Sequence, residues 1–171
     1  LTIANGTLSA VSSSDGGITW TATFTPTASV EDATNLITLD NTGVADVSGN
    51  AGTGTTNSNN YEIDTLRPTV AITSNKTSLA AGDTATITFT FSEAVTDFAQ
   101  GDVTVSGGAL SNFTGSGTSY SATFTPDVNS TTNGVLTVSN TKFTDAAGNA
   151  NTDGADANNT VTMTLIPAIA V

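Results

Sequence analysis

The chain has 171 residues, and its 15 acidic side chains face only three basic ones, which gives a formal net charge of −12. Such an acidic surface repels phosphate groups, so it argues against nucleic acids as partners. The sequence contains neither cysteine nor histidine, which excludes disulfides, thiolate zinc sites and catalysis by a serine–histidine triad. It also contains no run of about 18 apolar residues, and we expect no membrane insertion.

Short runs in which apolar and polar residues alternate predict β-strands along the whole chain. In residues 1–63 the inward-facing positions are Leu1, Ile3, Trp20, Ala22, Phe24, Ile37, Leu39, Tyr61 and Ile63. In the following residues they are Val70, Ile72, Ala85, Ile87, Phe89, Phe91, Val103, Val105, Tyr120, Ala122, Phe124, Leu136, Val138, Val161 and Met163. No stretch has a helical period, so the pattern predicts an all-β protein. Because successive side chains of a strand lie on opposite faces, we expect Trp20 to belong to a core with Ala22 and Phe24.

Three motifs occur twice in the chain. The sequence TWTATFTP at 19–26 returns as SYSATFTP at 119–126, VADVSGNAG at 44–52 as FTDAAGNAN at 143–151, and TLRPTVAI at 65–72 as TLIPAIAV at 164–171. The spacings are 100, 99 and 99 residues. One repeat therefore takes about 99 residues, the usual length of an immunoglobulin-like sandwich.

The repeat divides the chain into three parts. Residues 64–166 form one complete repeat. Residues 1–63 form an incomplete one that lacks the first two strands, because Leu1 aligns with Val103. Residues 167–171 match the start of the first strand of a further repeat. The chain is thus predicted to be an excerpt of a tandem array. In the alternative interpretation, the last strand of one chain completes the first repeat of a neighbouring chain.

The motifs resemble the bacterial immunoglobulin-like (BIg-type) tandem repeats of giant surface adhesins. The residues that carry the resemblance are RPTVAITSNKTSLAAGDTATITFTFSEAV at 67–95, GDVTVSGG at 101–108, SATFTP at 121–126 and FTDAAGN at 143–149. The resemblance implies tandem immunoglobulin-like β-sandwiches of about seven strands each, located outside the cell on a bacterial surface. Relatives of this kind space an adhesive tip from the cell, and many hold calcium in loops or at domain junctions.

Acidic residues favour a Ca²⁺ site at one pole of the complete repeat. In an immunoglobulin-like sandwich, the start of the first strand lies near the loops that follow the second and sixth strands. The oxygen ligands expected at this pole are Asp64, Glu93, Asp97, Asp102, Asp145 and Asn149, and the loop of Asp145 also carries Asp153 and Asp156. Asp46 and Asn50 form a weaker counterpart in the first repeat. Alternatively, these residues serve only as turn formers, since Asp and Asn side chains bond to nearby backbone.

The sequence favours a structural role: a spacer or stalk module of a large secreted adhesin, stiffened by Ca²⁺. Its partners are then neighbouring repeats of the same protein or identical chains. The first alternative is a subunit of an extracellular filament, such as a biofilm fibre, assembled by β-strand exchange. The second is a carbohydrate-binding accessory module. We expect no enzyme, because a repeat of about 99 residues has little room for a deep pocket.

Overall fold

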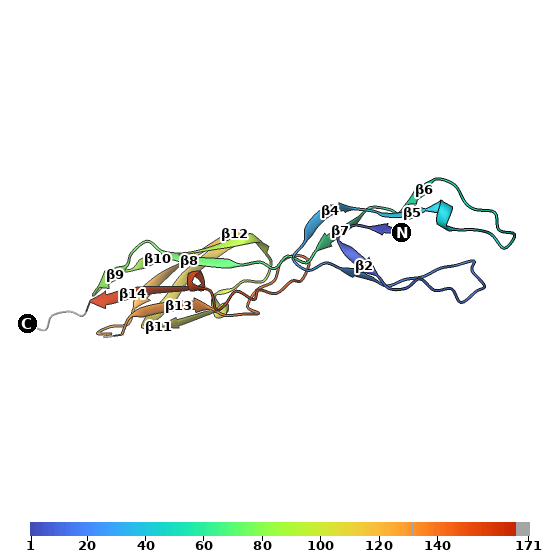
Figure 1. Ribbon diagram of the computed structural model, residues 1–171. Coiled ribbons are helices and arrows are strands. Elements are labelled where there is room, and N and C mark those ends of the chain that lie inside the picture. Colours follow the sequence, from blue (N-terminus) through green and yellow to red (C-terminus); the bar gives the residue numbers. More distant parts are fainter. Residues whose placement is uncertain (131, 167–171) are drawn as a thin grey trace, which may run out of the picture. The chain divides into compact units, whose positions relative to one another are not determined.

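The computed structural model describes residues 1–130 and 132–166 and divides into two compact units, Leu1–Leu66 (unit 1) and Arg67–Val171 (unit 2) (Figure 1). The described residues form β-strands and three short 3₁₀-helices, without any α-helix, which confirms the predicted all-β class. No helix in the described part is long and apolar enough to cross a membrane. Residues 167–171, predicted to open a further repeat, lie outside the described residues.

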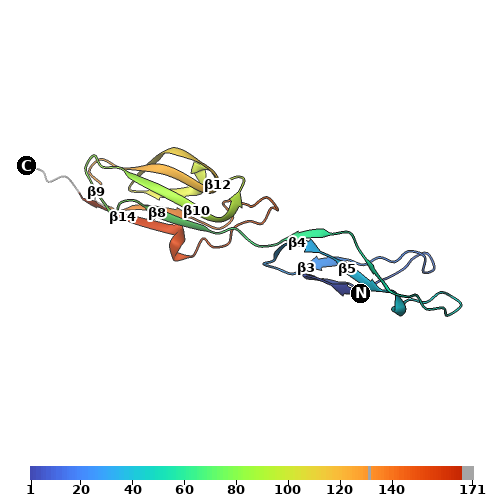
Figure 2. The same cartoon turned by 90° about the horizontal axis from the view of Figure 1, so that it is seen from above.

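Unit 2 is a sandwich of two sheets (Figures 1 and 2). Its strands are β8 (Val70–Ser74), β9 (Ser78–Ala80), β10 (Ala85–Val95), β11 (Val103–Ser106), β12 (Gly108–Pro126), β13 (Gly134–Val138) and β14 (Thr160–Ile166). One sheet has the order β12-β10-β8 and the other β11-β13-β14-β9. Neighbouring strands are antiparallel except β14 and β9, which are parallel. This arrangement is the immunoglobulin-like sandwich that the sequence predicts.

The core of unit 2 follows the alternation in the sequence. Along β10, Ala85, Ile87, Phe89 and Phe91 are buried, whereas the threonines between them are more exposed. The facing residues of the other strands are buried in the same cluster, among them Phe124, Leu136, Val138 and Met163. Removing one large apolar side chain from water contributes about 1.5–3 kcal/mol, so the burial of these rows stabilises unit 2.

An aromatic cluster fixes one end of the sandwich. Phe91 in β10 makes edge-to-face contacts with Phe98, Tyr120 and Phe143, at centroid distances of 4.9, 5.6 and 4.8 Å. Such contacts add about 0.5–1.5 kcal/mol to the burial of the rings. Phe98 and Phe143 lie outside the strands, in the segments that follow β10 and β13. The cluster therefore holds the loop 143–151 against the end of β10.

Unit 1 has seven short strands. They are β1 (Thr2–Ile3), β2 (Gly6–Leu8), β3 (Phe24–Pro26), β4 (Glu31–Asn35), β5 (Ile37–Asp40), β6 (Thr55–Asn57) and β7 (Tyr61–Asp64). They form three small sheets, β1-β5-β6, β2-β3 and β4-β7. The pairing of Ile3 with Ile37 matches the pairing of Val105 with Leu136 in unit 2. Unit 1 thus keeps the register of the repeat between these strands.

Unit 1 has no closed core. Among residues 1–66, all of which the structure describes, only Asn35 and Ile63 are buried. Trp20 is 60% exposed, so the prediction that it belongs to a core is wrong. Its counterpart Tyr120 is 8% exposed, because it pairs with Phe89 of β10. No strand within residues 1–66 occupies the position of β10 beside Trp20.

Candidate functional site

Asp145 begins a tight loop in unit 2 that contains the DAAGN motif. Its Oδ1 accepts a hydrogen bond from the Asn149 backbone N–H at 2.9 Å, and its Oδ2 accepts one from Asn149 Nδ2 at 2.8 Å. Gly148 has a φ of 91°, a left-handed conformation that side chains disfavour. Asp145 is 3% exposed. The turn-forming function that the sequence left open is thus present, and it holds this carboxylate in a fixed orientation.

The same loop occurs in unit 1. Asp46 Oδ1 accepts from the Asn50 backbone N–H at 2.9 Å, and Oδ2 accepts from Asn50 Nδ2 at 2.9 Å. These bonds, first that from the Asn50 side chain, lower the pKa of Asp46 below its ordinary value. Gly49, with a φ of 86°, takes the place of Gly148. Asp46 is exposed, however, whereas Asp145 is buried. The repeated sequence therefore determines the conformation of the loop. Whether the Asp of the loop is buried depends on the residues that pack against the loop.

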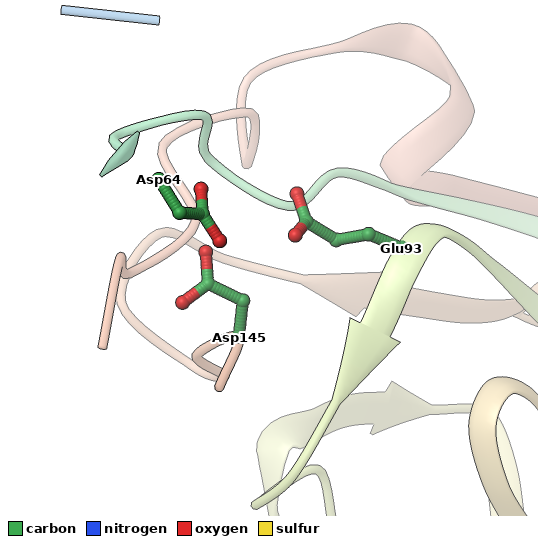
Figure 3. Close-up of side chains that lie close together, drawn as sticks. All are labelled: Asp64, Glu93 and Asp145. Carbon is green, nitrogen blue, oxygen red and sulfur yellow. The ribbon is translucent and has the colours of Figure 1, made fainter. Parts of the chain in front are cut away.

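Glu93 and Asp145 bring two carboxylates together within unit 2. A carboxylate oxygen of Glu93 and one of Asp145 lie within 4.8 Å of each other. Both side chains are drawn in Figure 3. Glu93 comes from the end of β10, where Val95 forms a β-bridge with Asp145. The Thr96 backbone N–H also donates to the Thr144 carbonyl oxygen at 3.2 Å. These backbone contacts position the pair.

Asp97 and Asp102 are engaged in local hydrogen bonds. Asp97 Oδ1 accepts from the Thr144 backbone N–H at 2.7 Å, and Oδ2 accepts from the Thr144 hydroxyl at 3.1 Å. Asp102 Oδ2 accepts from the Ala99 backbone N–H at 2.9 Å, at a short 3₁₀-helix, η2 (Gln100–Asp102). Asp97 thus supports the loop that carries Asp145, and Asp102 stabilises the turn that leads into β11. Their service as cation ligands stays a prediction.

Asp64 is the last residue of β7 and belongs to unit 1. It pairs with Glu31 of β4, and one of its carboxylate oxygens accepts from the Leu66 backbone N–H at 3.2 Å. Its side chain is the third one labelled in Figure 3. Five residues, 65–69, separate it from β8.

Two buried polar residues, Asp153, which the sequence places in the acidic loop, and Asn151, which it does not single out, connect the loop after Asn149 to the sandwich. Asp153 is 8% exposed; its Oδ2 accepts from the Val70 backbone N–H at 2.7 Å and its Oδ1 from Asn151 Nδ2 at 2.8 Å. Asn151 is fully buried, and its Oδ1 accepts from the Lys142 backbone N–H at 2.8 Å. In sequence Asn151 resembles any turn-forming Asn, and nothing there distinguishes the supporting function of Asp153 from that of a cation ligand. Asp153 therefore holds the start of β8 in place through its hydrogen bond with Val70.

The pair Glu93 and Asp145 offers carboxylate oxygens, which are hard donors. Such donors suit Ca²⁺, which takes six to eight oxygen ligands in flexible geometries. They are poor donors for soft metals, which prefer sulfur or imidazole. The chemistry of the donor set thus fits a calcium ion.

Comparison with known protein families gives one match in two copies. The bacterial Ig-like domain family matches residues 1–63 and, again, residues 64–162. Neither the comparison with curated proteins nor that with solved structures found a match. Domains of this family are typically non-catalytic and typically occur in surface or extracellular proteins. The two matches span nearly the whole chain and agree with its all-β sandwich and its repeated loop motifs, so the chain belongs to the bacterial Ig-like domain family.

Proposed function

We propose that the chain is a spacer segment of a large secreted bacterial adhesin, non-catalytic and located on the cell surface. The observation that carries this proposal is the tandem arrangement of two bacterial Ig-like units joined by a connection of five residues, 65–69. A spacer needs tandem units and connections that restrict bending.

The connection is anchored on both sides of Leu66. In unit 1, the Thr65 hydroxyl donates to the Thr27 carbonyl oxygen at 2.7 Å, and the Thr65 backbone N–H donates to the Val30 carbonyl oxygen at 2.8 Å. In unit 2, Arg67 donates to the Ala150 carbonyl oxygen at 2.7 Å. Pro68 fixes its own φ and restricts Arg67. Leu66 is then the only residue between the two anchors, which supports a connection of low flexibility.

Calcium is the second part of the proposal. Glu93 and Asp145 supply two carboxylates in unit 2. Asp64, the last residue of β7, stays a ligand predicted from the sequence alone. A bound cation would offset the repulsion between the Glu93 and Asp145 carboxylates, which in the absence of an ion is only partly screened.

Thermal unfolding of the chain in Ca²⁺ and in EDTA tests the cation. At a Ca²⁺ concentration 100 times the Kd, binding to the folded state alone adds about 2.7 kcal/mol, which raises the melting temperature by several degrees. Equal melting temperatures in Ca²⁺ and EDTA would remove calcium from the proposal. Mg²⁺ serves as the control, because it demands a stricter octahedral geometry.

Small-angle scattering tests the spacer itself. A stiff connection predicts a single, narrow distribution of interdomain distances in saturating Ca²⁺. Two units that reorient freely under the same conditions would contradict the spacer role. Small-angle scattering reports on the stiffness of the connection, whereas thermal unfolding reports on cation binding. The two measurements therefore test the spacer and the calcium hypotheses separately.

A further inference from the structure

Glycine directly follows Asn or Asp at four places in the chain. These are Asn5-Gly6, Asp15-Gly16, Asn133-Gly134 and Asp153-Gly154. Because glycine has no side chain, its backbone nitrogen can closely approach Cγ of the residue before it. Attack of that nitrogen on Cγ closes a cyclic imide, with loss of ammonia at Asn and of water at Asp. The four sites share this chemistry, so the contacts around each one decide which of them reacts.

The side chain of Asn5 is held by hydrogen bonds. Its Nδ2 donates to Asp32 Oδ2 and to Asn35 Oδ1, both at 2.8 Å, and Asn35 is buried. The Asn5 backbone oxygen also accepts from the Thr27 backbone N–H at 2.9 Å. Closing the imide would turn Cγ toward the Gly6 nitrogen and break both bonds of Nδ2, which raises the barrier to the reaction.

The two Asp sites are also engaged. Asp15 Oδ1 accepts from the Thr19 backbone N–H at 2.9 Å, and the bonds from Thr19 are the first cause that lowers the pKa of Asp15 from 3.8 to about 2. At neutral pH this group is therefore an ionised carboxylate, which is a poor target for a nucleophile. At Asp153 the attacking group is held, because the Gly154 backbone N–H donates to Asn140 Oδ1 at 2.7 Å.

Asn133 differs from the other three residues. It is exposed and lies directly before β13, and its side chain makes no hydrogen bond with any residue that the structure describes. The residue after it has to be glycine, since a Cβ at Gly134 would lie 2.6 Å from Cζ of the buried Phe124 ring. The packing of the core thus places an unhindered backbone nitrogen beside an Asn side chain that nothing holds in place.

We propose that Asn133 is a site of spontaneous deamidation in the folded chain. The Gly134 backbone nitrogen bonds to Asn133 Cγ and gives up its proton, the Cγ–Nδ2 bond breaks, and ammonia leaves with that proton. Water then opens the cyclic imide. Addition of water at Cγ gives an aspartyl residue, whereas addition at the main-chain carbonyl carbon gives an isoaspartyl residue, whose backbone runs through Cβ and Cγ. Both products carry a negative charge that the amide lacks.

The isoaspartyl product should weaken unit 2 where β12 and β13 are joined. It lengthens the backbone by one methylene directly before Gly134, which is buried. The chain is closely packed there, because a Cβ at Gly107 would lie 2.5 Å from the Asn133 backbone oxygen. An extra group in a close-packed region forces the backbone to shift. Chains with the isoaspartyl residue should therefore melt at a lower temperature than chains that retain Asn133.

Ageing of the intact chain at neutral pH, followed by peptide mass spectrometry, tests the proposal. Deamidation in ¹⁸O-labelled water marks each residue that has reacted, and unchanged amide NMR signals show that unit 2 stays folded. Asn133 should convert at least about tenfold faster than Asn5, because only Asn5 must first break two hydrogen bonds of Nδ2. In guanidinium, where these bonds are absent, the two Asn-Gly sites should convert at similar rates.

Two variants isolate the cause of the difference. Asn133→Gln should stop the conversion at this position, because its longer side chain would have to close a larger ring. Asp32→Ala should speed the conversion of Asn5 by removing one acceptor of its Nδ2, and should leave the rate at Asn133 unchanged.

Conversion of Asn5 as fast as that of Asn133 in the folded chain would overturn the proposal. Conversion of Asn133 in guanidinium but not in the folded chain would also overturn it, since the folded backbone would then prevent ring closure. Neither result depends on calcium or on the stiffness of the connection, so the test is independent of the proposed spacer function.

Discussion

The guanidinium of Arg67 donates a hydrogen bond to the carbonyl oxygen of Ala150, with Nη1 and the oxygen 2.7 Å apart. Ala150 lies in the loop 143–151, one residue after Asn149, which binds the Asp145 carboxylate. The segment that enters β8 is therefore fixed to the loop that presents Asp145. One exposed hydrogen bond thus links the connection between the units to the candidate cation site.

Replacing Arg67 should loosen the connection without unfolding unit 2. Because the Arg67 side chain is exposed, Arg67→Ala should lower the free energy of unfolding by about 1 kcal/mol or less. The backbone amides of residues 66–69 should become more mobile in ¹⁵N relaxation. Lys76→Ala is the control, since it removes the exposed ion pair with Asp83, 3.5 Å long, elsewhere in unit 2. Unchanged relaxation at residues 66–69 in Arg67→Ala would contradict the anchoring function of Arg67.

Asp153 should be more important for stability than its exposed neighbour Asp156. Asp153→Ala leaves the buried Val70 N–H without its acceptor, which costs about 1–3 kcal/mol. Asp156→Ala removes an exposed carboxylate that makes no side-chain cap, so its effect should be within about 0.5 kcal/mol. Urea unfolding of both variants measures the difference. Equal stabilities would show that Asp153 does not support β8.

The sequence predicts the core of unit 2 well, because a period of 2 assigns faces directly. Ile87, Phe89 and Phe124 are completely buried, as expected from alternation. Phe98 and Phe143 are buried too, but they lie in loops, where no period applies. Trp20 fits the alternating pattern, but its side chain is exposed. The period shows which side chains share a face of a strand, but not whether another strand covers that face.

The candidate site is predictable only in part, for a related reason. The topology of an immunoglobulin-like sandwich predicts that the acidic loops lie at one pole. Glu93 and Asp145 do lie close together there. The sequence does not specify which carboxylates are already engaged by backbone donors. Asp97 binds Thr144, and Asp153 binds Val70. Such bonds depend on distances between loops that differ by a few ångströms, which residue spacing does not encode.

Gly134 should resist substitution because of its contact with the core. A Cβ at this position would lie 2.6 Å from Phe124 Cζ, and the Phe124 ring is completely buried. Gly134→Ala should therefore destabilise unit 2 by about 1–3 kcal/mol through overpacking. Gly101→Ala is the matched control, since no atom lies within 4 Å of its added Cβ. Thermal unfolding compares the stabilities of the Gly134→Ala and Gly101→Ala variants. An unchanged melting temperature in Gly134→Ala would mean that the Phe124 ring can shift to make room for the added Cβ.

The turn at Ser13–Thr19 should persist to low pH. Hydrogen bonds to Asp15, first from the Thr19 backbone N–H and then from the side chains of Thr19 and Ser13, lower its pKa from 3.8 to about 2. Because the folded pKa lies below the unfolded value, the stabilisation is present above about pH 4 and is lost as the pH falls through about 2. NMR titration of the Asp15 carboxyl should give a midpoint near 2, and Ser13→Ala should raise it. A midpoint near 3.8 in the unmodified chain would contradict the hydrogen bonds of this turn.

Glu93→Gln should change stability in opposite directions with and without calcium. In EDTA the substitution removes one of two carboxylates that lie within 4.8 Å of each other, so relief of repulsion should raise the melting temperature by a few degrees. In saturating Ca²⁺ the same substitution removes a charged ligand, so the melting temperature should fall below that of the unmodified chain. Asp127→Asn makes the same change of charge at an exposed position and should respond equally in both conditions. A shift of the same sign and size in EDTA and Ca²⁺ would mean that Glu93 has only a structural function, because repulsion between the two carboxylates and ligation of a cation require opposite signs.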